Sequence, residues 1–397
     1  MVLGNESIRP QALGVATALA LAIAIVAAST RGSPVPVGGI ERGDAASIVF
    51  FAALAVGFAL YAGGLVALRR AGGRLATILV IAVAIQLIPL AGPLLLSHDV
   101  YSYWAYARIT SRHDSNPYVV PPARFPSDPA TRVVAPGWRD TTSVYGPAFT
   151  AFSIGVDRAT QSSETVALVF RTVAALATIA ATVLAAYIAR RKAFAAAFLG
   201  WNPLLAVSFA GGGHNDALML VLMLGALALA SRRRDFAAGG LWMLAAAVKA
   251  PALFLLPLQL VRSRRRFWAG CAVAGIAGLL AATLAFGSRW LTIGRLGHNE
   301  ARYAIPVRLE QFGLPDRAAH LIAAAALVVG ALWLLRQALK GRTRLALGAC
   351  LLVLTTPWLL PWYATWPVAL AAVEEDAVAR VLALAIAAYL LSARVPF

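Results

Sequence analysis

The sequence contains little charge and almost no cysteine. Only 13% of the 397 residues are charged, whereas 60% are hydrophobic, and the mean hydropathy is +0.75. This composition excludes an ordinary soluble domain and indicates an integral membrane protein. The two cysteines, Cys271 and Cys350, both lie in apolar runs just after basic stretches, so we expect neither a disulfide nor a zinc site from them.

Acidic residues are also scarce. The 17 acidic residues are outnumbered by 35 basic ones, which gives a formal net charge of +18. In a soluble protein this excess would suggest nucleic acid as a partner. Here positive loops between apolar runs mark the cytoplasmic side of a membrane, so we expect membrane lipids as neighbours and no nucleic-acid partner. The basic clusters lie at 69–70, 190–192, 232–234, 264–266 and 340–344.

Long apolar runs are abundant, and several reach the roughly 20 residues that a helix needs to cross a bilayer. The first run follows a single basic residue, Arg9, so we interpret it as a helix and not as a cleaved signal. The pattern predicts an all-α polytopic membrane protein with about 11–13 transmembrane helices in one domain, 1–397. Candidate spans are 11–29, 47–68, 75–96, 164–189, 194–210, 216–231, two short runs within 236–260, 267–287, 317–339, 345–357, 363–373 and 376–394.

One apolar region breaks the alternation of sides. Both of its ends, Arg234 and Arg262, are basic, although only one span's worth of apolar residues lies between them. A single span would place the two ends on opposite sides of the membrane. We therefore favour a pair of short helices that meet at Lys249, where Pro251 follows closely.

Counting from the basic loop at 69–74 places the longest non-spanning segment, 97–163, on the extracytoplasmic side. Its partly apolar end, 147–156, is expected to lie along the membrane surface. The same counting brings residues 214–216, 288–316 and 357–366 to that side. The sequence thus predicts a multi-pass protein of the inner (plasma) membrane whose polar residues gather on its outer face.

Polar and aromatic side chains begin directly after the apolar run that ends at residue 96, with His98, Asp99, Tyr101 and Tyr103. Aromatic faces combined with a few charged groups suit sugars, whose ring faces stack while their hydroxyls need hydrogen bonds. Two structural alternatives remain open. Asp99 would then be a helix cap or a solvated anchor, and the aromatic residues an interfacial belt.

A glycine run delivers His214, Asn215 and Asp216 to the start of an apolar helix. As structure, these residues would form a helix cap. As function, they offer an imidazole and free helix N–H groups to an anion. Lys249 is a cation between apolar residues, a placement that indicates function by default, and near the outer leaflet its ammonium would hold a phosphate.

Four motifs together resemble those of a known superfamily. Asp99-Val-Tyr-Ser-Tyr103 follows an early helix, Asn116-Pro-Tyr118 and Tyr145-Gly-Pro147 form turns, and His214-Asn-Asp216 begins a helix. The chain thus resembles the GT-C superfamily of polyprenyl-phosphate-sugar-dependent glycosyltransferases. More narrowly, it is similar to the actinobacterial polyprenyl-phosphate-mannose-dependent α-mannosyltransferases, which build lipoglycans outside the membrane. That family often has further C-terminal helices or a soluble tail, and sometimes two adjacent acids where this chain has His98-Asp99.

The resemblance implies an inverting transfer of mannose from polyprenyl-phosphate-mannose to a glycan or glycolipid acceptor, without a cofactor or a metal ion. Asp99 would act as general base, and a single carboxylate fits inversion. Lys249, His214 and Arg108 would bind the donor phosphate, with Arg302 and Arg308 in reserve. The expected substrate-binding residues are His98, Tyr101, Tyr103, Asn116, Tyr118, Tyr145, Asn215 and Asp216.

Other functions fit parts of the same pattern. Among enzymes, the alternative is one that transfers another sugar, such as glucose or arabinofuranose, from the same class of lipid donor. A transporter or flippase of lipid-linked sugars would place ionisable groups near the bilayer midplane and show paired halves with broken helices. The sequence shows one such break, at Lys249, and gathers its polar groups at one face. A non-enzymatic scaffold is the third alternative.

Overall fold

The computed structural model describes residues 9–30, 44–160, 162–291 and 301–393, and their regular structure is helical throughout. Five helices are long and apolar enough to cross a membrane. The prediction of an all-α polytopic membrane protein is therefore confirmed, whereas the assignment of the whole chain to one domain stays a prediction. The five helices are α1 (Pro10–Ser29), α2 (Ala45–Ala71), α7 (Ser163–Ile188), α13 (Arg265–Phe286) and α15 (Asp316–Leu339).

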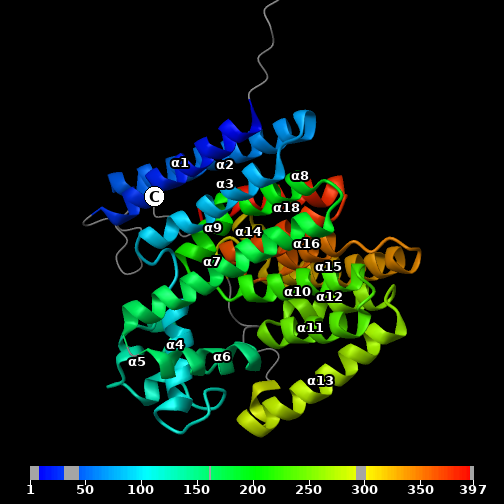
Figure 1. Cartoon of the computed structure of the whole chain (residues 1–397). Coiled ribbons are helices and arrows are strands. Elements are labelled where there is room, and N and C mark those ends of the chain that lie inside the picture. The colour runs from blue at the N-terminus through cyan, green and yellow to red at the C-terminus, as the bar shows by residue number, and fades with distance from the viewer. Residues whose placement is uncertain (1–8, 31–43, 161, 292–300, 394–397) are drawn as a thin grey trace, which may run out of the picture.

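Shorter apolar helices fill the space between the long ones (Figure 1). Because each has 10–17 residues, the expected total of transmembrane helices stays a prediction. They are α3 (Leu75–Leu87) with η1 (Ile88–Ala91), α10 (Asp216–Ser231), α11 (Asp235–Val248), α12 (Pro251–Leu260), α16 (Leu345–Thr355) and α18 (Ala377–Tyr389), and α17 (Thr365–Val373) packs among them.

Local sequence explains where several helices begin and end. The Asp44 carboxylate accepts from the N–H groups of Ala46 and Ser47 and so begins α2, which ends at Gly72 with a φ of 69°. The Asp376 carboxylate begins α18 in the same way. Between helices, small residues allow close packing: a Cβ placed on Gly57 of α2 would lie 3.4 Å from the Cβ of Ala20 in α1.

The helix break at Lys249 is confirmed. α11 ends at Val248, Lys249 adopts an extended backbone, and α12 begins at Pro251. A second break differs from the single span expected at 194–210: α8 (Lys192–Gly200) and the segment Pro203–Gly211 are bent by 50°. Asn202 caps the second piece, and Pro203 is its first residue. The break falls here because proline cannot continue the hydrogen-bond ladder of α8. The segment contains α9 (Pro203–Ala206) and a π-helix, η4 (Val207–Gly211).

The described residues of 97–163 form a compact helical unit where the sequence predicts a long loop. It contains α4 (Asp99–Ser111), α5 (Pro129–Val133) and α6 (Pro147–Ala159), which lie together at the lower left of Figure 1. Its centre is Asp157, whose fully buried carboxylate accepts hydrogen bonds from Trp104, Arg108, Ser111 and Arg112. Several donors on one carboxylate offset the cost of burying it.

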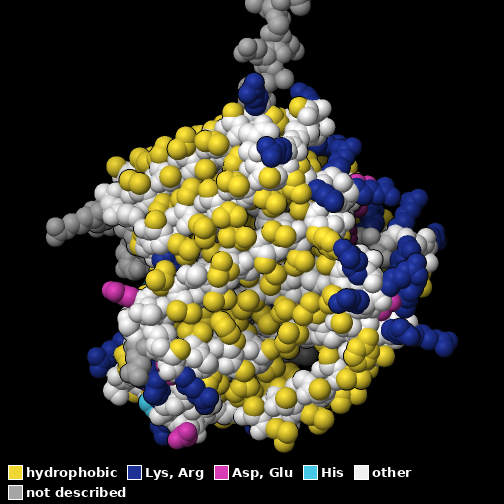
Figure 2. All heavy atoms as spheres, viewed as in Figure 1, with side chains coloured by type: hydrophobic (Ala, Val, Ile, Leu, Met, Phe, Trp, Pro, Cys, Tyr) yellow, Lys and Arg dark blue, Asp and Glu magenta, His cyan; other side chains and the backbone are white. Residues whose placement is uncertain are grey.

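Basic clusters that are distant in the sequence meet at one end of the bundle. Arg344 pairs with Asp376 at 2.6 Å and Arg190 with Glu375 at 3.6 Å, and the charges of Arg69 and Arg191 act on Arg380. Figure 2 shows Lys and Arg side chains along the right-hand edge and hydrophobic side chains over most of the visible face. This separation is the one expected of helices that cross a bilayer with their basic ends on one side.

Candidate functional site

The site centres on Asp99, the first residue of α4. Its Oδ2 lies 3.3 Å from Nδ1 of His214, and 20% of the Asp99 side chain is exposed against 1% of His214. The imidazole also stacks on the indole of Trp362, with ring centroids 3.6 Å apart. The Asp99 carboxylate therefore faces an ordered, buried partner on one side and remains open to a ligand on the other.

Burial by itself would raise the pKa of Asp99. The neighbouring His214 imidazole, Ser97 hydroxyl and Lys249 ammonium more than offset this effect and hold the pKa below its ordinary value. Asp99 is thus a carboxylate at neutral pH. The charge of Lys249 acts on Asp99, although among the described residues the ion pair of Lys249 is with Asp216 and not with Asp99. An acid and a cation therefore lie close together.

An ion pair lies beside the contact of Asp99 with His214. The Lys249 ammonium donates to Oδ2 of Asp216 at 2.7 Å and to Oδ1 of Asn215 at 3.3 Å. The other oxygen of Asp216 accepts from Nε1 of Trp366 at 2.5 Å. Neither Asp216 nor Asn215 makes a side-chain cap hydrogen bond on α10. The alternative of a side-chain cap is therefore not seen, and both side chains instead contact Lys249. Nδ2 of Asn215 is buried and has no hydrogen-bond partner among the described residues.

Three aromatic residues from η6 (Pro361–Ala364) and the start of α17 line the same site, and the sequence analysis missed them as site residues. The Lys249 ammonium lies 5.1 Å from the ring centre of Tyr363 and 5.8 Å from that of Trp366, and these two rings stack at 4.3 Å. Trp362 and Trp366 are buried whereas Tyr363 is partly exposed. The sequence could have pointed to these residues, because several aromatic residues cluster at 358–366 on the predicted outer side.

Tyr103, Tyr118, Tyr145 and Asn116, which were expected to bind substrate, instead make contacts within the protein next to the site. Tyr103 is buried, accepts the backbone N–H of Asn215 at 3.4 Å and packs edge-to-face on Tyr145. The Tyr118 hydroxyl donates to the Tyr145 carbonyl at 2.9 Å. The Asn116 amide donates to the carbonyl of Phe286 at the end of α13. The two turns of the sequence motifs thus hold the tyrosines against the loop that carries His214.

His98 and Tyr101 flank Asp99 and are only partly buried. Their rings meet edge-to-face, and Nδ1 of His98 lies 3.0 Å from the Val133 carbonyl. Both residues thus lie next to Asp99 along the chain with part of their surface accessible.

Arg108 lies elsewhere on α4. It follows Asp99 by nine residues, about 13 Å along the helix axis, and its guanidinium is already paired with Asp128 at 2.8 Å and with Asp157 at 3.3 Å. The structure does not bring Arg108 together with Lys249 and His214. Of the reserve residues, Arg308 donates to the Tyr389 hydroxyl and to Gln311. Arg302 adjoins Ala301, whose N–H donates to the Pro357 carbonyl beside the aromatic run.

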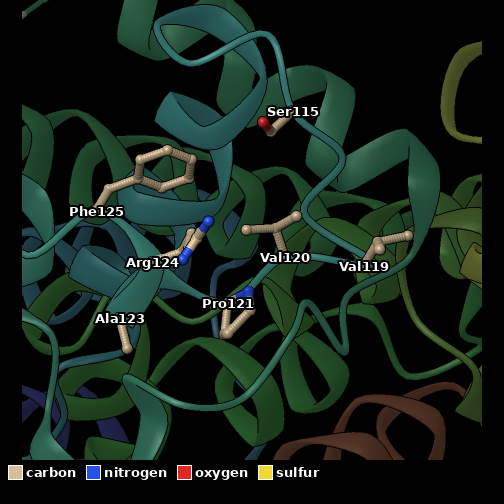
Figure 3. A pocket seen from close by; sticks show the side chains of 7 residues that line it. All are labelled: Ser115, Val119, Val120, Pro121, Ala123, Arg124 and Phe125. Carbon is tan, nitrogen blue, oxygen red and sulfur yellow. The ribbon is translucent and has the colours of Figure 1, made fainter.

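A hollow of about 590 Å³ opens on the surface of the 97–163 unit. Figure 3 shows Ser115 at the top, Phe125, Arg124 and Ala123 on the left, Val120 and Pro121 in the middle and Val119 on the right. None of the expected site residues lines this hollow. It is a surface feature of the unit and not the place where Asp99 and Lys249 meet.

One group of described residues has the composition of a metal site. Glu310, Asp316 and His320 place their ligand atoms within 4.8 Å of one another on α14 (Ile305–Gln311) and α15. Such groups are common on exposed surfaces without an ion, and Asp99 is not one of them. The expectation that the reaction needs no metal ion stays a prediction.

Comparison with known proteins finds similar sequences of one kind. A family model described as alpha-(1->6)-mannopyranosyltransferase, N-terminal domain, matches residues 11–265. Alpha-(1->6)-mannopyranosyltransferase A of Mycobacterium tuberculosis is 28% identical over 338 residues, which cover 74% of this chain and 65% of the relative. The protein of the same name from Corynebacterium glutamicum is 29% identical over 168 residues, 41% of this chain and 34% of the relative.

The chain spans less than two thirds of the length of these relatives. No solved structure matches it. The matched region 11–265 includes Asp99, His214, Asp216 and Lys249, whereas the aromatic run 358–366 lies beyond it. Since the family model covers more than half of the sequence, the chain belongs to the alpha-(1->6)-mannopyranosyltransferase family.

Proposed function

We propose that the protein transfers mannose from polyprenyl-phosphate-mannose to a glycan or glycolipid acceptor on the extracytoplasmic side of the plasma membrane. The observation that supports this most is the ionised, partly exposed Asp99 held by a buried imidazole beside the Lys249 ammonium. Family membership supports mannose as the sugar. The apolar helices around the site support a donor with a lipid tail.

In this proposal Asp99 is the general base. The acceptor hydroxyl loses its proton to the Asp99 carboxylate, the acceptor oxygen forms a bond to C1 of mannose, and the bond from C1 to the phosphate oxygen breaks. The lipid phosphate leaves with the electron pair of that bond. His214 is too buried to meet the acceptor, so its role is to orient Asp99 and to stabilise its charge.

The proposed stereochemistry is inversion. Retention through a covalent intermediate needs a second carboxylate that reaches the sugar. Asp216 is the nearest candidate among the described residues, but it is fully buried and both of its oxygens are bound, by Lys249 and by Trp366. One accessible carboxylate therefore fits a single displacement with inversion at C1.

Lys249 is the proposed ligand of the donor phosphate. It is 17% exposed and borders the partly exposed ring of Tyr363. Its charge is shared with Asp216, so a phosphate needs further donors. Arg302 is the proposed second cation because its segment touches Pro357, whereas the Nδ2 of Asn215 is unpartnered but as buried as His214. Arg108 is better explained as a structural ion-pair partner of Asp128 and Asp157.

The test of the base is Asp99→Asn, which keeps the size of the side chain and removes its basicity. We expect transfer from polyprenyl-phosphate-mannose to a mannoside acceptor to fall by about 10²–10⁴, with donor binding little changed. Asp140→Asn, an exposed acid of the same unit, is the matched control. Near-normal turnover of Asp99→Asn would remove Asp99 from catalysis, and a preference for a glucose or arabinofuranose donor would change the proposed sugar.

The proposed side of the membrane has its own test. A cysteine at Ser127, an exposed residue of the 97–163 unit, should react with an impermeant thiol reagent in intact cells. A cysteine at Ser231, beside the basic cluster 232–234, should react only after lysis. The native Cys271 and Cys350 are buried and give little background. The opposite labelling pattern would invert the topology and reject an extracytoplasmic donor site.

A further inference from the structure

A buried arginine lies behind the site, on a membrane-spanning helix. Arg171 of α7 is 6% exposed, and among the described residues it has no carboxylate partner. A charged side chain within a span is costly and marks a functional role more often than not. The sequence analysis did not single out Arg171, although it is a cation within an otherwise apolar run, the same signal that marked Lys249.

The two partners of Arg171 are backbone carbonyls at irregular helix ends. Nε donates to the Ala210 carbonyl at 2.8 Å, and Nη2 donates to the Pro89 carbonyl. Ala210 belongs to the π-helix η4, and Pro89 to the 3₁₀ turn η1. The Pro89 carbonyl also accepts the N–H of Gly92 at 3.1 Å, so Arg171 is its second donor. At irregular helix ends inside a membrane, side-chain donors supply bonds that the regular helical ladder does not.

Each carbonyl leads to one half of the Asp99–His214 pair. From Pro89 the chain runs through Leu95 to Asp99, and from Ala210 it runs through Gly211 to His214. The two paths are joined directly, because the N–H of Leu95 donates to the Gly211 carbonyl at 3.0 Å. Arg171 therefore bridges the two backbone segments that set the distance between the Asp99 carboxylate and the imidazole.

The loop also packs against Arg171 itself. Gly213 has a φ of 70°, and a Cβ placed there would lie 2.5 Å from Cγ1 of Val100 and 3.4 Å from Cγ of Arg171. The chain thus passes between the start of α4 and Arg171 immediately before His214. A shift of the guanidinium would be transmitted to His214 on one side and to the residue after Asp99 on the other.

We propose that Arg171 is a positioning residue of the transfer reaction: its guanidinium holds the Pro89 and Ala210 carbonyls together and so sets the contact between Asp99 and His214. This inference rests on the proposed function of Asp99 as base. Arg171 touches neither sugar nor phosphate in this role, so its loss slows turnover without weakening donor binding.

The test variant is Arg171→Lys, which keeps the charge and can donate to one carbonyl but not in the forked geometry of a guanidinium. Arg380→Lys is the matched control, because the Arg380 guanidinium donates to the Ala371 carbonyl at 3.1 Å on the basic side of the bundle. We expect Arg171→Lys to lower kcat by at least about tenfold with KM for the donor within about threefold, and Arg380→Lys to leave both nearly unchanged.

A second readout separates positioning from general damage to the fold. Since His214 helps to lower the pKa of Asp99, a looser contact should move the acid limb of the kcat/KM profile to higher pH. The same shift should occur in His214→Gln, and Arg171→Lys should add little to it in the double variant. The titratable and charged groups whose charges act on Asp99, or on which it acts, are His214, Lys249, Tyr103, Tyr106, Tyr145 and Tyr363.

The possible results have distinct meanings. An acid limb that stays in place, an increase of KM alone, or a protein that no longer elutes as a folded monodisperse species would overturn the positioning role. Near-normal transfer by the Asp99→Asn variant would instead reject the proposed function. A normal Asp99→Asn defect together with unaffected Arg171→Lys kinetics would reject only the inference on Arg171.

Discussion

Gly146 of the Tyr-Gly-Pro turn is the position where a single methyl group should disturb both the fold and the site. It precedes α6 with a φ of −65°, a backbone that alanine adopts without strain. A Cβ at this position would nevertheless lie 2.1 Å from the carbonyl oxygen of Ala247 and 2.8 Å from that of Val248. The effect of Gly146→Ala is therefore steric and not conformational.

The size of the effect follows from these distances. Ordinary contact begins at 3.4 Å, so the end of α11 must move by more than 1 Å relative to α6. Overpacking of this kind costs about 1–3 kcal/mol. Lys249 follows Val248 directly, so the same movement displaces its ammonium from Asp216, which it contacts at 2.7 Å. A misplacement of about 1 Å in a site can slow a reaction about 100-fold.

The assay compares Gly146→Ala with Gly155→Ala on the same helix, where an added Cβ meets nothing within 4 Å. We expect thermal unfolding in detergent to fall by roughly 2–6 °C for Gly146→Ala, at about 2 °C per kcal/mol for a long chain. Gly155→Ala should leave it unchanged or raise it slightly, because alanine favours a helix over glycine. Equal unfolding temperatures and equal transfer by both variants would refute the reasoning.

Two further changes test charged groups. Lys249→Met should destabilise the protein by about 3–5 kcal/mol, because it leaves the buried Asp216 carboxylate without its cation. Adding Asp216→Asn should restore most of the unfolding temperature but not saturation by the donor. Restored donor saturation would exclude Lys249 as a phosphate ligand. Burial raises the pKa of Glu374 to about 7 although two backbone N–H groups of α16 bind it. Its folded form thus holds a proton more tightly than its unfolded form, so stability should decline between about pH 4.5 and 7, and Glu374→Gln should flatten this decline in detergent unfolding experiments.

The sequence by itself determined the class of the fold. Apolar runs of sufficient length, separated by basic clusters, specify helices in a membrane because each helix satisfies its own backbone groups there. The break at Lys249 was also predictable, because Pro251 and the basic residues at both ends of the region are visible in the local sequence. The break at Asn202-Pro203 contained the same local information, and the expected single span overlooked it.

The motif residues were predictable as a set, but not their individual contacts. Asp99, His214 and Lys249 lie near one another in the structure, whereas Arg108 lies in a separate ion-pair cluster. From its spacing, Arg108 was as plausible a phosphate ligand as Lys249. The difference arose from Asp128 and Asp157, which lie 20 and 49 residues further along the chain.

Only the tertiary structure decided which side chains complete the site. Asp216 looks like a helix cap in the sequence, yet it binds Trp366 from 150 residues away and Lys249 from 33. Arg171 reaches Pro89 across 82 residues. Local propensity describes a residue's neighbours along the chain, but a buried charge takes its partners from whatever the packed helices bring within about 3 Å, and that juxtaposition exists only once the chain has folded.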